Sequence, residues 1–588
     1  MKKTSIILVM LFIFLALSLP NVEASERAII NSGNWEDVYS GIIYSKLEGK
    51  EYDFLTSTRH ATIIANALPS TVESVEILSS SNNPFITGYT SLIQDRGFED
   101  VEEIRSNNLN LEILQRLPDI DRFIVLDGTY GYNAVSVAPF AVMGRYYVIM
   151  ADEGNIGAVM NELEDRTVSE VIIYGHTDRE VRLELAQYDP EIINTGDRFD
   201  DNIQMVEKYQ ELHRTLRGEP RRQAILTNGE FLEASIFTGT EPVLFIGFAN
   251  VPDHVRSYIQ QSDLEVGTLV GNELIGTATF IRRETGLSVF VKFGQGARTP
   301  TGAIAQVEDL DRFPIPRFNL DLDIVSAVVN TASQELEITY QNDAPIATYF
   351  RNILIRLSID GANYVISDDV LSTFIDGNSF KTLTFPLIDG DDNPINVEGE
   401  EREIEVNTIY GESPRSLEQS LNRTLTLEEI SVLDDAQLDI VDVSYSNIRG
   451  GFLIELRNPG NVDTYTIVEV IDLDVAGEIL SFSSEEPISI SPERTNTVFV
   501  STTMTDEDVV NNQEIKIRAY YGERENSLIR MKEAIFEFKY ATLGVTFYVI
   551  IILIILLLVL FFWRKGCKHC GYKNPAVRKT CKKCGKEL

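Results

Sequence analysis

The sequence predicts a multidomain chain that combines α/β and all-β folds. We expect three small parallel-sheet α/β repeats, two β-sandwiches, one transmembrane helix and a small C-terminal module that contains the four cysteines. Apolar strands that end in glycine recur at Gly33, Gly128 and Gly229, each with a helical pattern after it. From about residue 318 the pattern changes to period-two alternation with frequent turn residues. All four cysteines lie in the last 22 residues, directly after a long uncharged apolar segment.

Residues 1–24 have the pattern of a signal peptide. Lys2 and Lys3 form a short basic start, residues 6–19 are apolar, and Ala24 is a small residue suited to cleavage. An uncleaved membrane anchor is the alternative. Either segment would export the chain that follows it.

The exported part, residues 25–540, is strongly acidic. It carries 40 Lys and Arg against 87 Asp and Glu, a net charge of −47, and it has no cysteine. A surface of this kind repels nucleic acid and suits divalent cations, so Ca²⁺ is a candidate ligand of the ectodomain. Neighbouring acids such as Asp200 and Asp201 could hold it loosely, although solvated loop acids are the alternative.

Three repeats are predicted at residues 25–120, 121–220 and 221–312. Each begins with a short apolar strand and continues with an amphipathic helix and a second apolar strand. In the first helix, Trp35 and Tyr39 fall on one face at the helical period. Short apolar runs that alternate with amphipathic helices are typical of parallel sheets covered on both faces.

Several helix starts in these repeats share a motif. Residues 34–40 read Asn-Trp-Glu-Asp-Val-Tyr-Ser, and residues 196–202 read Gly-Asp-Arg-Phe-Asp-Asp-Asn. Here the chain resembles the cell-wall-binding repeat type 2 family, whose members carry three small α/β domains in tandem. The resemblance covers about half of the chain. It implies retention at a cell surface through contact with an anionic wall polymer.

Asp197 and Arg198 are the candidate ligand-binding residues that this resemblance implies. The alternative is a helix-capping acid next to a structural ion pair, because Asp at a helix N-terminus accepts free backbone N–H groups. In the third repeat, residues 277–291 are expected to replace the motif with a hairpin that turns at Gly286.

Two immunoglobulin-like β-sandwiches are predicted at residues 318–427 and 436–540. The stretch Tyr410-Gly-Glu recurs as Tyr521-Gly-Glu, and other pairs of segments repeat along the two halves. These modules resemble the sandwiches of archaeal surface-layer-type proteins, which implies that they lift the three α/β repeats away from a membrane. Asn422 begins the only Asn-x-Ser/Thr sequence and is a candidate for glycosylation.

Residues 543–563 carry no charge and are long enough to cross a bilayer as a helix. The segment after them, residues 564–588, has nine Lys and Arg and a single acid, which predicts a cytoplasmic tail and a type I, single-pass protein at the cell membrane. In that tail, Cys567, Cys570, Cys581 and Cys584 form two CxxC pairs, each followed by glycine. The spacing resembles a zinc ribbon, in which four thiolates hold one structural Zn²⁺ and leave no open position for water.

The sequence shows no pattern of a known catalytic site in the exported part. HExxH, GxSxG and P-loop motifs are absent, and His176, at the end of a predicted strand, is the most suggestive histidine. A loop histidine beside the next helix is the alternative for His176.

We therefore expect a non-enzymatic surface protein of surface-layer or envelope-binding type that acts in coat assembly or adhesion. Its expected partners are an envelope polymer or other surface proteins. A receptor that signals through a cytoplasmic partner of the zinc ribbon is the second hypothesis, and an envelope hydrolase is the third.

Overall fold

The computed structural model describes residues 25–271, 274–292, 296–301, 304–317, 319–366, 371–388, 393–397, 402–484, 486–541, 564–575 and 578–588. The chain forms two compact units, Met1–Leu433 and Asp434–Leu588, which are described separately below. The predicted signal peptide and the predicted transmembrane helix both lie outside the described residues. Within those residues, no helix combines the length and the apolar character that crossing a membrane requires.

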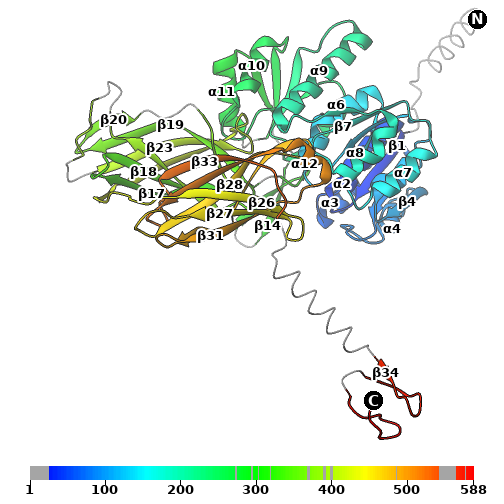
Figure 1. The fold of residues 1–588 in the computed structure, drawn as a ribbon. Helices are drawn as coiled ribbons and strands as arrows, with labels where there is room; N and C mark the ends of the chain where they lie inside the picture. Colours follow the sequence, from blue (N-terminus) through cyan, green and yellow to red (C-terminus); the bar gives the residue numbers. More distant parts are fainter. Residues whose placement is uncertain are drawn as a thin grey trace, which may run out of the picture. The chain divides into compact units, whose positions relative to one another are not determined.

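Repeat 1 contains a four-stranded parallel sheet in the order β2-β1-β3-β4. Its elements are β1 (Ser25–Asn31), α2 (Trp35–Glu48), β2 (Glu51–Phe54), α3 (Thr58–Ala67), β3 (Val72–Ser80), α4 (Tyr89–Gln94), β4 (Asp100–Ser106) and α5 (Leu109–Leu114). Helices cover the sheet (Figure 1), and the central strands β1 and β3 are its most deeply buried strands, whereas the edge strand β4 is mostly polar.

Repeats 2 and 3 have the same strand order, β6-β5-β7-β8 and β11-β9-β12-β13, and every pairing in them is parallel. Repeat 2 comprises β5 (Arg122–Leu126), α6 (Tyr132–Gly144), β6 (Tyr147–Met150), α7 (Ile156–Glu164), β7 (Glu170–Tyr174), α8 (Arg179–Leu185), η1 (Ala186–Tyr188), β8 (Glu191–Ile193) and α9 (Arg198–Arg217). Repeat 3 comprises β9 (Gln223–Thr227), β10 (Phe231–Glu233), η2 (Ala234–Thr238), β11 (Val243–Phe245), α10 (Asp253–Gln261), β12 (Val266–Val270), α11 (Ile275–Thr285) and β13 (Ser288–Lys292). The shared order confirms the predicted α/β repeats with parallel sheets.

The hairpin predicted in repeat 3 is wrong. Residues 275–285 form helix α11, and β13 then pairs in parallel with β12. Gly286 has φ 77° and ends the helix instead of turning a hairpin, a position that glycine fills without steric cost. Arg282 and Arg283 lie in the last turn, where positive charge favours a helix C-terminus.

One hydrophobic core runs through all three repeats, which together we call the head. Its centre is formed by α2, α6 and the short helix η2, which pack against one another pairwise. Tyr39 of α2 meets Phe237 of η2 with ring centroids 5.4 Å apart. Because each repeat contributes one element to this centre, the repeats bury this apolar surface jointly, while repeat 1 has a second, separate core of its own.

Successive repeats are joined by asparagine side chains that are buried at their contacts. Asn110 of α5 donates to the carbonyl of Val148 at 2.8 Å and accepts from the N–H of Met150 at 3.1 Å, both on β6 of repeat 2. Asn202 of α9 makes the same pair of bonds to Val243 (3.0 Å) and Phe245 (2.8 Å) on β11 of repeat 3. Each carboxamide therefore forms hydrogen bonds with a carbonyl and an N–H group at the outer edge of the next repeat's sheet.

After the head, β14 (Gly296–Thr301) pairs with β15 (Ile304–Asp309), and β16 (Arg312–Pro314) pairs with β10. The first β-sandwich follows and has two antiparallel sheets, in the orders β22-β18-β17-β25 and β20-β19-β23-β24, although β25 pairs in parallel with β17. Its strands are β17 (Leu322–Asn330), β18 (Glu335–Asn342), β19 (Thr348–Ile359), β20 (Ala362–Ile366), β21 (Thr373–Ile375), β22 (Ser379–Pro386), β23 (Arg402–Gly411), β24 (Gln419–Thr426) and β25 (Glu428–Ile430).

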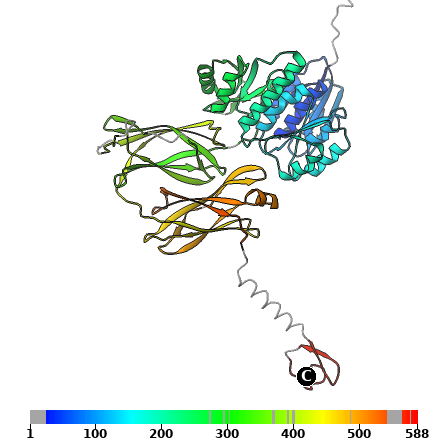
Figure 2. The ribbon, with the colours of Figure 1, turned by 45° about the horizontal axis from the view of Figure 1, so that its top comes forward.

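The second unit begins with another sandwich, with sheets in the orders β26-β27-β31 and β29-β28-β32-β33. Its elements are β26 (Asp439–Ser446), β27 (Gly451–Arg457), β28 (Thr464–Val475), β29 (Glu478–Ser483), β30 (Ile488–Ile490), β31 (Thr495–Ser501), α12 (Asp506–Asn511), β32 (Glu514–Gly522) and β33 (Arg530–Glu537). Figure 2 shows that, apart from α12, the yellow and orange part of the chain consists of strands.

Two buried asparagines show that the sandwiches are related. Asn342 and Asn458 are fully buried, and each donates to the carbonyl four residues further on, Ile346 and Val462. Each also accepts from the backbone N–H two residues further on. Equal bonds at equivalent positions agree with the duplication seen in the sequence.

Candidate metal centre and buried joint

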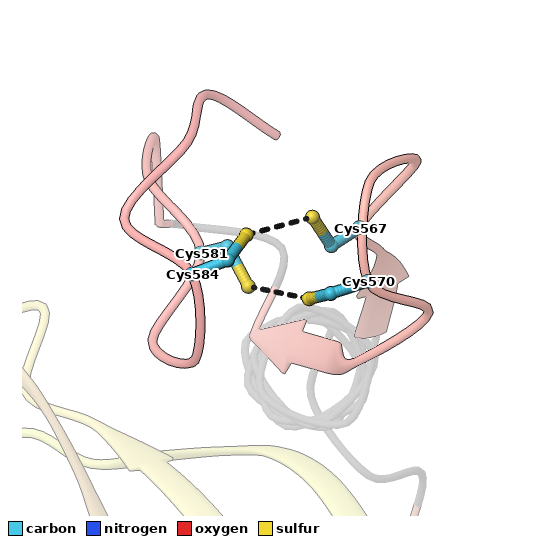
Figure 3. Close-up of side chains that lie close together, drawn as sticks. All are labelled: Cys567, Cys570, Cys581 and Cys584. Atoms are coloured by element: carbon cyan, nitrogen blue, oxygen red, sulfur yellow. Dashed lines mark hydrogen bonds between the residues drawn. The ribbon is translucent and has the colours of Figure 1, made fainter.

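The four cysteines lie together in a small module built around β34 (Arg564–Gly566) and β35 (Lys573–Pro575). Two tight turns position the thiols: the N–H of Gly571 bonds to the carbonyl of Cys567 at 2.8 Å, and Gly585 bonds to Cys581 at 2.9 Å. Both glycines have φ near 70°, where a side chain would be strained. The two turns face each other, so their sulfurs converge (Figure 3).

The sulfur positions form a compact group. The Sγ atoms of Cys567 and Cys584, and those of Cys570 and Cys581, are 3.5 Å apart, and all four lie within 4.8 Å of one another. A Zn–S bond of about 2.3 Å places tetrahedral sulfurs about 3.8 Å apart. The four thiols can therefore bind one metal ion of this size, such as zinc.

Asn574 connects the two turns and is fully buried. Its Nδ2 lies 3.4 Å from Sγ of Cys581 and 2.9 Å from the carbonyl of Tyr572, and its Oδ1 accepts from the N–H of Lys582 at 2.8 Å. Although burial alone would raise the pKa of Cys581, the N–H of Lys583 and the Asn574 amide lower that pKa to about 6. The module thus favours a thiolate at Cys581, the form that binds metal.

The second cluster lies where the head meets the first sandwich, and we call it the joint. Asp197 caps α9 by accepting from the N–H groups of Phe199 (2.9 Å) and Asp200 (3.2 Å). It also accepts from the hydroxyls of Ser413 (2.5 Å) and Ser416 (2.7 Å), in the loop between β23 and β24. Burial alone would raise the pKa of Asp197, but the bonds from the two serines lower it.

Arg198 forms the charged part of the joint. Its Nε is 2.5 Å from Glu412 and its Nη2 is 2.5 Å from Glu418, both in the same sandwich loop. The guanidinium lies over the rings of Tyr132 (4.9 Å) and Phe199 (4.6 Å). With 10% of the Arg198 side chain exposed, this is a buried ion network and not a surface salt bridge.

The joint holds more acid than base, which affects the pKa of Glu412. Burial raises this pKa to about 7, although Arg198 opposes the rise. The Oε2 atom of Glu412 is buried and accepts no hydrogen bond from the part of the chain that the structure describes. Burial would lower the pKa of Arg198, but Glu412 and Glu418 raise it, so we regard Arg198 as the permanent cation.

His254 of α10 lies beside the joint, with Nε2 3.9 Å from Asp197 and 3.7 Å from Asp200. The three side chains are close enough to hold a metal ion. However, Asp197 already accepts four hydrogen bonds, and Arg415 lies 2.6 Å from Asp200. A second cation would compete with these partners, so the geometry favours an ion-pair network at this position.

The structure places Asp197 and Arg198 together in the joint, where they perform the capping and ion-pairing roles of the structural alternative. Ligand binding by these two residues stays a prediction. Asn422 is exposed on β24, and glycosylation of its side chain stays a prediction. His176 is exposed after β7, and Asp178 occupies the N-terminal position of α8.

Sequence reasoning missed the sandwich side of the joint and the asparagine bridges. Glu412, Ser413 and Ser416 lie more than 200 positions from Asp197 and Arg198, and no local pattern links the two segments. Asn202 lies inside the motif at residues 196–202, and this motif was the available sequence signal for its bridge to repeat 3. Its 2.7 Å bond to the hydroxyl of Ser136 stays within repeat 2.

A cavity of about 660 Å³ lies where repeat 1 meets repeat 3, and we call it the β2 cavity. Its lining includes Tyr52 and Phe54 of β2, Ile63 and Ala67 of α3, and Lys292 of β13. Smaller hollows of about 530 and 300 Å³ lie beside Trp35 and His254.

No protein-family model matches the chain, and no curated protein matches it. Among solved structures, Cwp6 from Clostridium difficile shares 12% identity over 45% of this chain, with a TM-score of 0.34. The match spans only 44% of Cwp6. The CupB2 chaperone of Pseudomonas aeruginosa (12% identity, TM-score 0.12) and the periplasmic chaperone SfaE (14%, 0.14) match 36% and 38% of this chain over 97% and 100% of their own. At this level of similarity we draw no functional conclusion from these proteins.

Proposed function

We propose that the chain is a non-enzymatic cell-surface protein that acts in coat assembly or adhesion. In this proposal residues 1–24 direct export, residues 543–563 anchor the chain in the cell membrane, and the acidic head and sandwiches lie outside. The cysteine module lies in the cytoplasm, where a reducing environment keeps thiols free to bind a structural Zn²⁺.

The joint is the observation that supports this proposal. Parallel α/β sheets usually bind ligands beyond the carboxyl ends of their strands. In repeats 2 and 3 the sandwich loop takes this place: Glu412 and Glu418 pair with Arg198, and the backbone N–H groups of Ala249 and Asn250 bond to the carbonyl of Glu418 at 2.9 and 2.8 Å. A protein that uses this region to join two domains is better suited to mechanical work than to turnover.

The test is sedimentation of the full-length protein with and without Ca²⁺ and with isolated cell-envelope fractions. Assembly that depends on Ca²⁺, or co-sedimentation with envelope, is the expected result, because bridging cations would let acidic surfaces associate. A monomer indifferent to both additions would contradict the proposal.

A receptor is the second candidate, and the basic cysteine module favours it. Lys568, Lys582 and Lys583 are exposed beside the metal-binding turns, which gives a compact cationic surface for a cytoplasmic partner or the inner leaflet. Deleting residues 564–588 separates the two candidates. A coat protein keeps its surface location and assembly after this deletion, whereas a receptor loses its cytoplasmic output.

A further inference from the structure

The three repeats share one sheet order, so each has an equivalent outer strand: β2, β6 and β11. On β6 and β11, the carbonyl of one residue and the N–H of the residue two positions later face outward. A carboxamide bonds to both groups in each case, that of Asn110 on β6 and that of Asn202 on β11. Two of the three outer edges are therefore completed by the same chemical group.

The outer edge of β2 presents the same two groups. The N–H of Leu55 bonds to the carbonyl of Ile30 on β1 at 2.9 Å, as Ala151 and Ile246 bond to β5 and β9 in the other repeats. Because strand residues alternate in direction, the carbonyl of Tyr52 and the N–H of Phe54 face away from β1. No carboxamide bonds to them within the described ranges, and both Tyr52 and Phe54 line the β2 cavity.

The cavity has further properties of a binding site. Its volume of about 660 Å³ falls in the range of small-molecule and peptide-side-chain pockets. The hydroxyl of Tyr52, a residue that lines the cavity, is buried and has no hydrogen-bond partner among the residues that the structure describes. Lys46 lies 5.0 Å from the centre of the Tyr52 ring, so the Tyr52 face of the cavity is both polar and aromatic.

We propose that the β2 cavity binds the side-chain carboxamide of an asparagine or glutamine in a peptide segment of a partner protein. A primary carboxamide carries C=O and N–H on one edge and can bond to Phe54 and Tyr52 at once, as Asn110 and Asn202 do on the equivalent strands. A carboxylate has no donor for the carbonyl of Tyr52. A trans backbone amide points its C=O and N–H in opposite directions. The site therefore selects one functional group, and this inference does not depend on the surface role proposed above.

The experiment measures binding of three capped tripeptides to the full-length protein by ligand-observed NMR. They are acetyl-Ala-X-Ala-N-methylamide with X as Asn, Asp or Leu, a cap that adds no second primary carboxamide. The Asn peptide is expected to bind at least tenfold more tightly than the other two. Equal binding of all three peptides overturns the proposal. So does no binding of the Asn peptide at 10 mM, because two hydrogen bonds correspond to a dissociation constant of about this size.

Two variants locate the binding. Ala67→Trp places a large ring at the exposed rim of the cavity and is expected to abolish binding of the Asn peptide. Asn66→Trp adds the same ring to the neighbouring exposed position of α3, which does not line the cavity, and should leave binding unchanged. Selective Asn binding that persists in Ala67→Trp, with the fold intact by circular dichroism, would place the site elsewhere and refute the assignment. Concentration-dependent self-association that Ala67→Trp abolishes would support the assignment and identify a second copy of this chain as the partner.

Discussion

Removal of the guanidinium at Arg198 should uncouple the head from the first sandwich. In Arg198→Ala, the carboxylates of Glu412 and Glu418, whose side chains are 13% and 7% exposed, lose their cation while still buried. Breaking a buried ion pair from one side costs about 3–5 kcal/mol, because the remaining charge has no compensation. The lost ring contacts to Tyr132 and Phe199 add about 1 kcal/mol.

The assay is urea unfolding of the full-length protein, followed by tryptophan fluorescence. The chain has two tryptophans, and Trp35 is buried in α2, so it reports on the head. We expect Arg198→Ala to lower the free energy of unfolding of this transition by about 3–5 kcal/mol, or by the whole docking energy if that is smaller. In the second case the loop between β23 and β24 becomes sensitive to protease, because its carboxylates move into water.

The matched control is Arg423→Ala. Arg423 makes a two-bond salt bridge to Asp323 at 2.6 Å, but the two side chains are 49% and 34% exposed. Exposed pairs contribute about 0–1 kcal/mol, so this variant should remain close to the parent protein. If Arg198→Ala shifts stability no more than Arg423→Ala and the loop stays resistant to protease, the burial argument for the joint is refuted.

Three further outcomes are expected. Because burial raises the pKa of Glu412 from 4.5 to about 7, its contribution to stability is complete below pH 4.5 and is lost as the pH rises through 7. Glu412→Gln should therefore reduce the fall in urea midpoint between pH 5 and pH 8. An unchanged pH dependence would show that the Glu412 carboxyl does not cause the fall. Asn110→Ala leaves the N–H of Met150 and the carbonyl of Val148 without their partner and should cost about 1–3 kcal/mol, whereas exposed Asn66→Ala should cost little; equal effects in urea unfolding would contradict the bridge. Metal analysis should find one zinc per chain, lost in Cys581→Ser but kept in His569→Ala, since His569 is exposed and outside the sulfur cluster; loss of zinc in His569→Ala would rule out a four-thiolate site.

Patterns within short stretches of sequence were sufficient to predict the α/β repeats and the cysteine module. Glycines at Gly33, Gly128 and Gly229 end equivalent strands, and the spacing of two CxxC pairs reflects turns closed by neighbouring residues. The hairpin in repeat 3 was predicted wrongly because β-branched and aromatic residues around Gly286 suit a strand as well as a partly buried helix. The structure differs from a hairpin in that β13 pairs in parallel with β12, and pairing with a strand about 20 residues away is not visible in a short window of sequence.

The joint shows the other limit of sequence reasoning. The N-terminal cap at Asp197 could be expected from its position before a helix, since capping needs only nearby backbone groups. The serines and glutamates that complete the joint come from a different domain. They are polar residues in a loop, and such residues are usually exposed to solvent, so the sequence does not indicate that they are buried. Only the fold shows that Glu412 and Glu418 are buried against Arg198.

The asparagine bridges give the head a direction along the chain. Asn110 of repeat 1 completes the edge of repeat 2, and Asn202 of repeat 2 completes the edge of repeat 3. A chain that emerges from its N-terminus therefore presents each helix before the strand that needs it, and the edge of a newly formed sheet meets a waiting partner instead of a neighbouring chain. Vectorial synthesis would assemble such a head in order, whereas refolding of the whole chain from denaturant must find the same pairings without that order. We expect refolding to aggregate more than synthesis does for this reason.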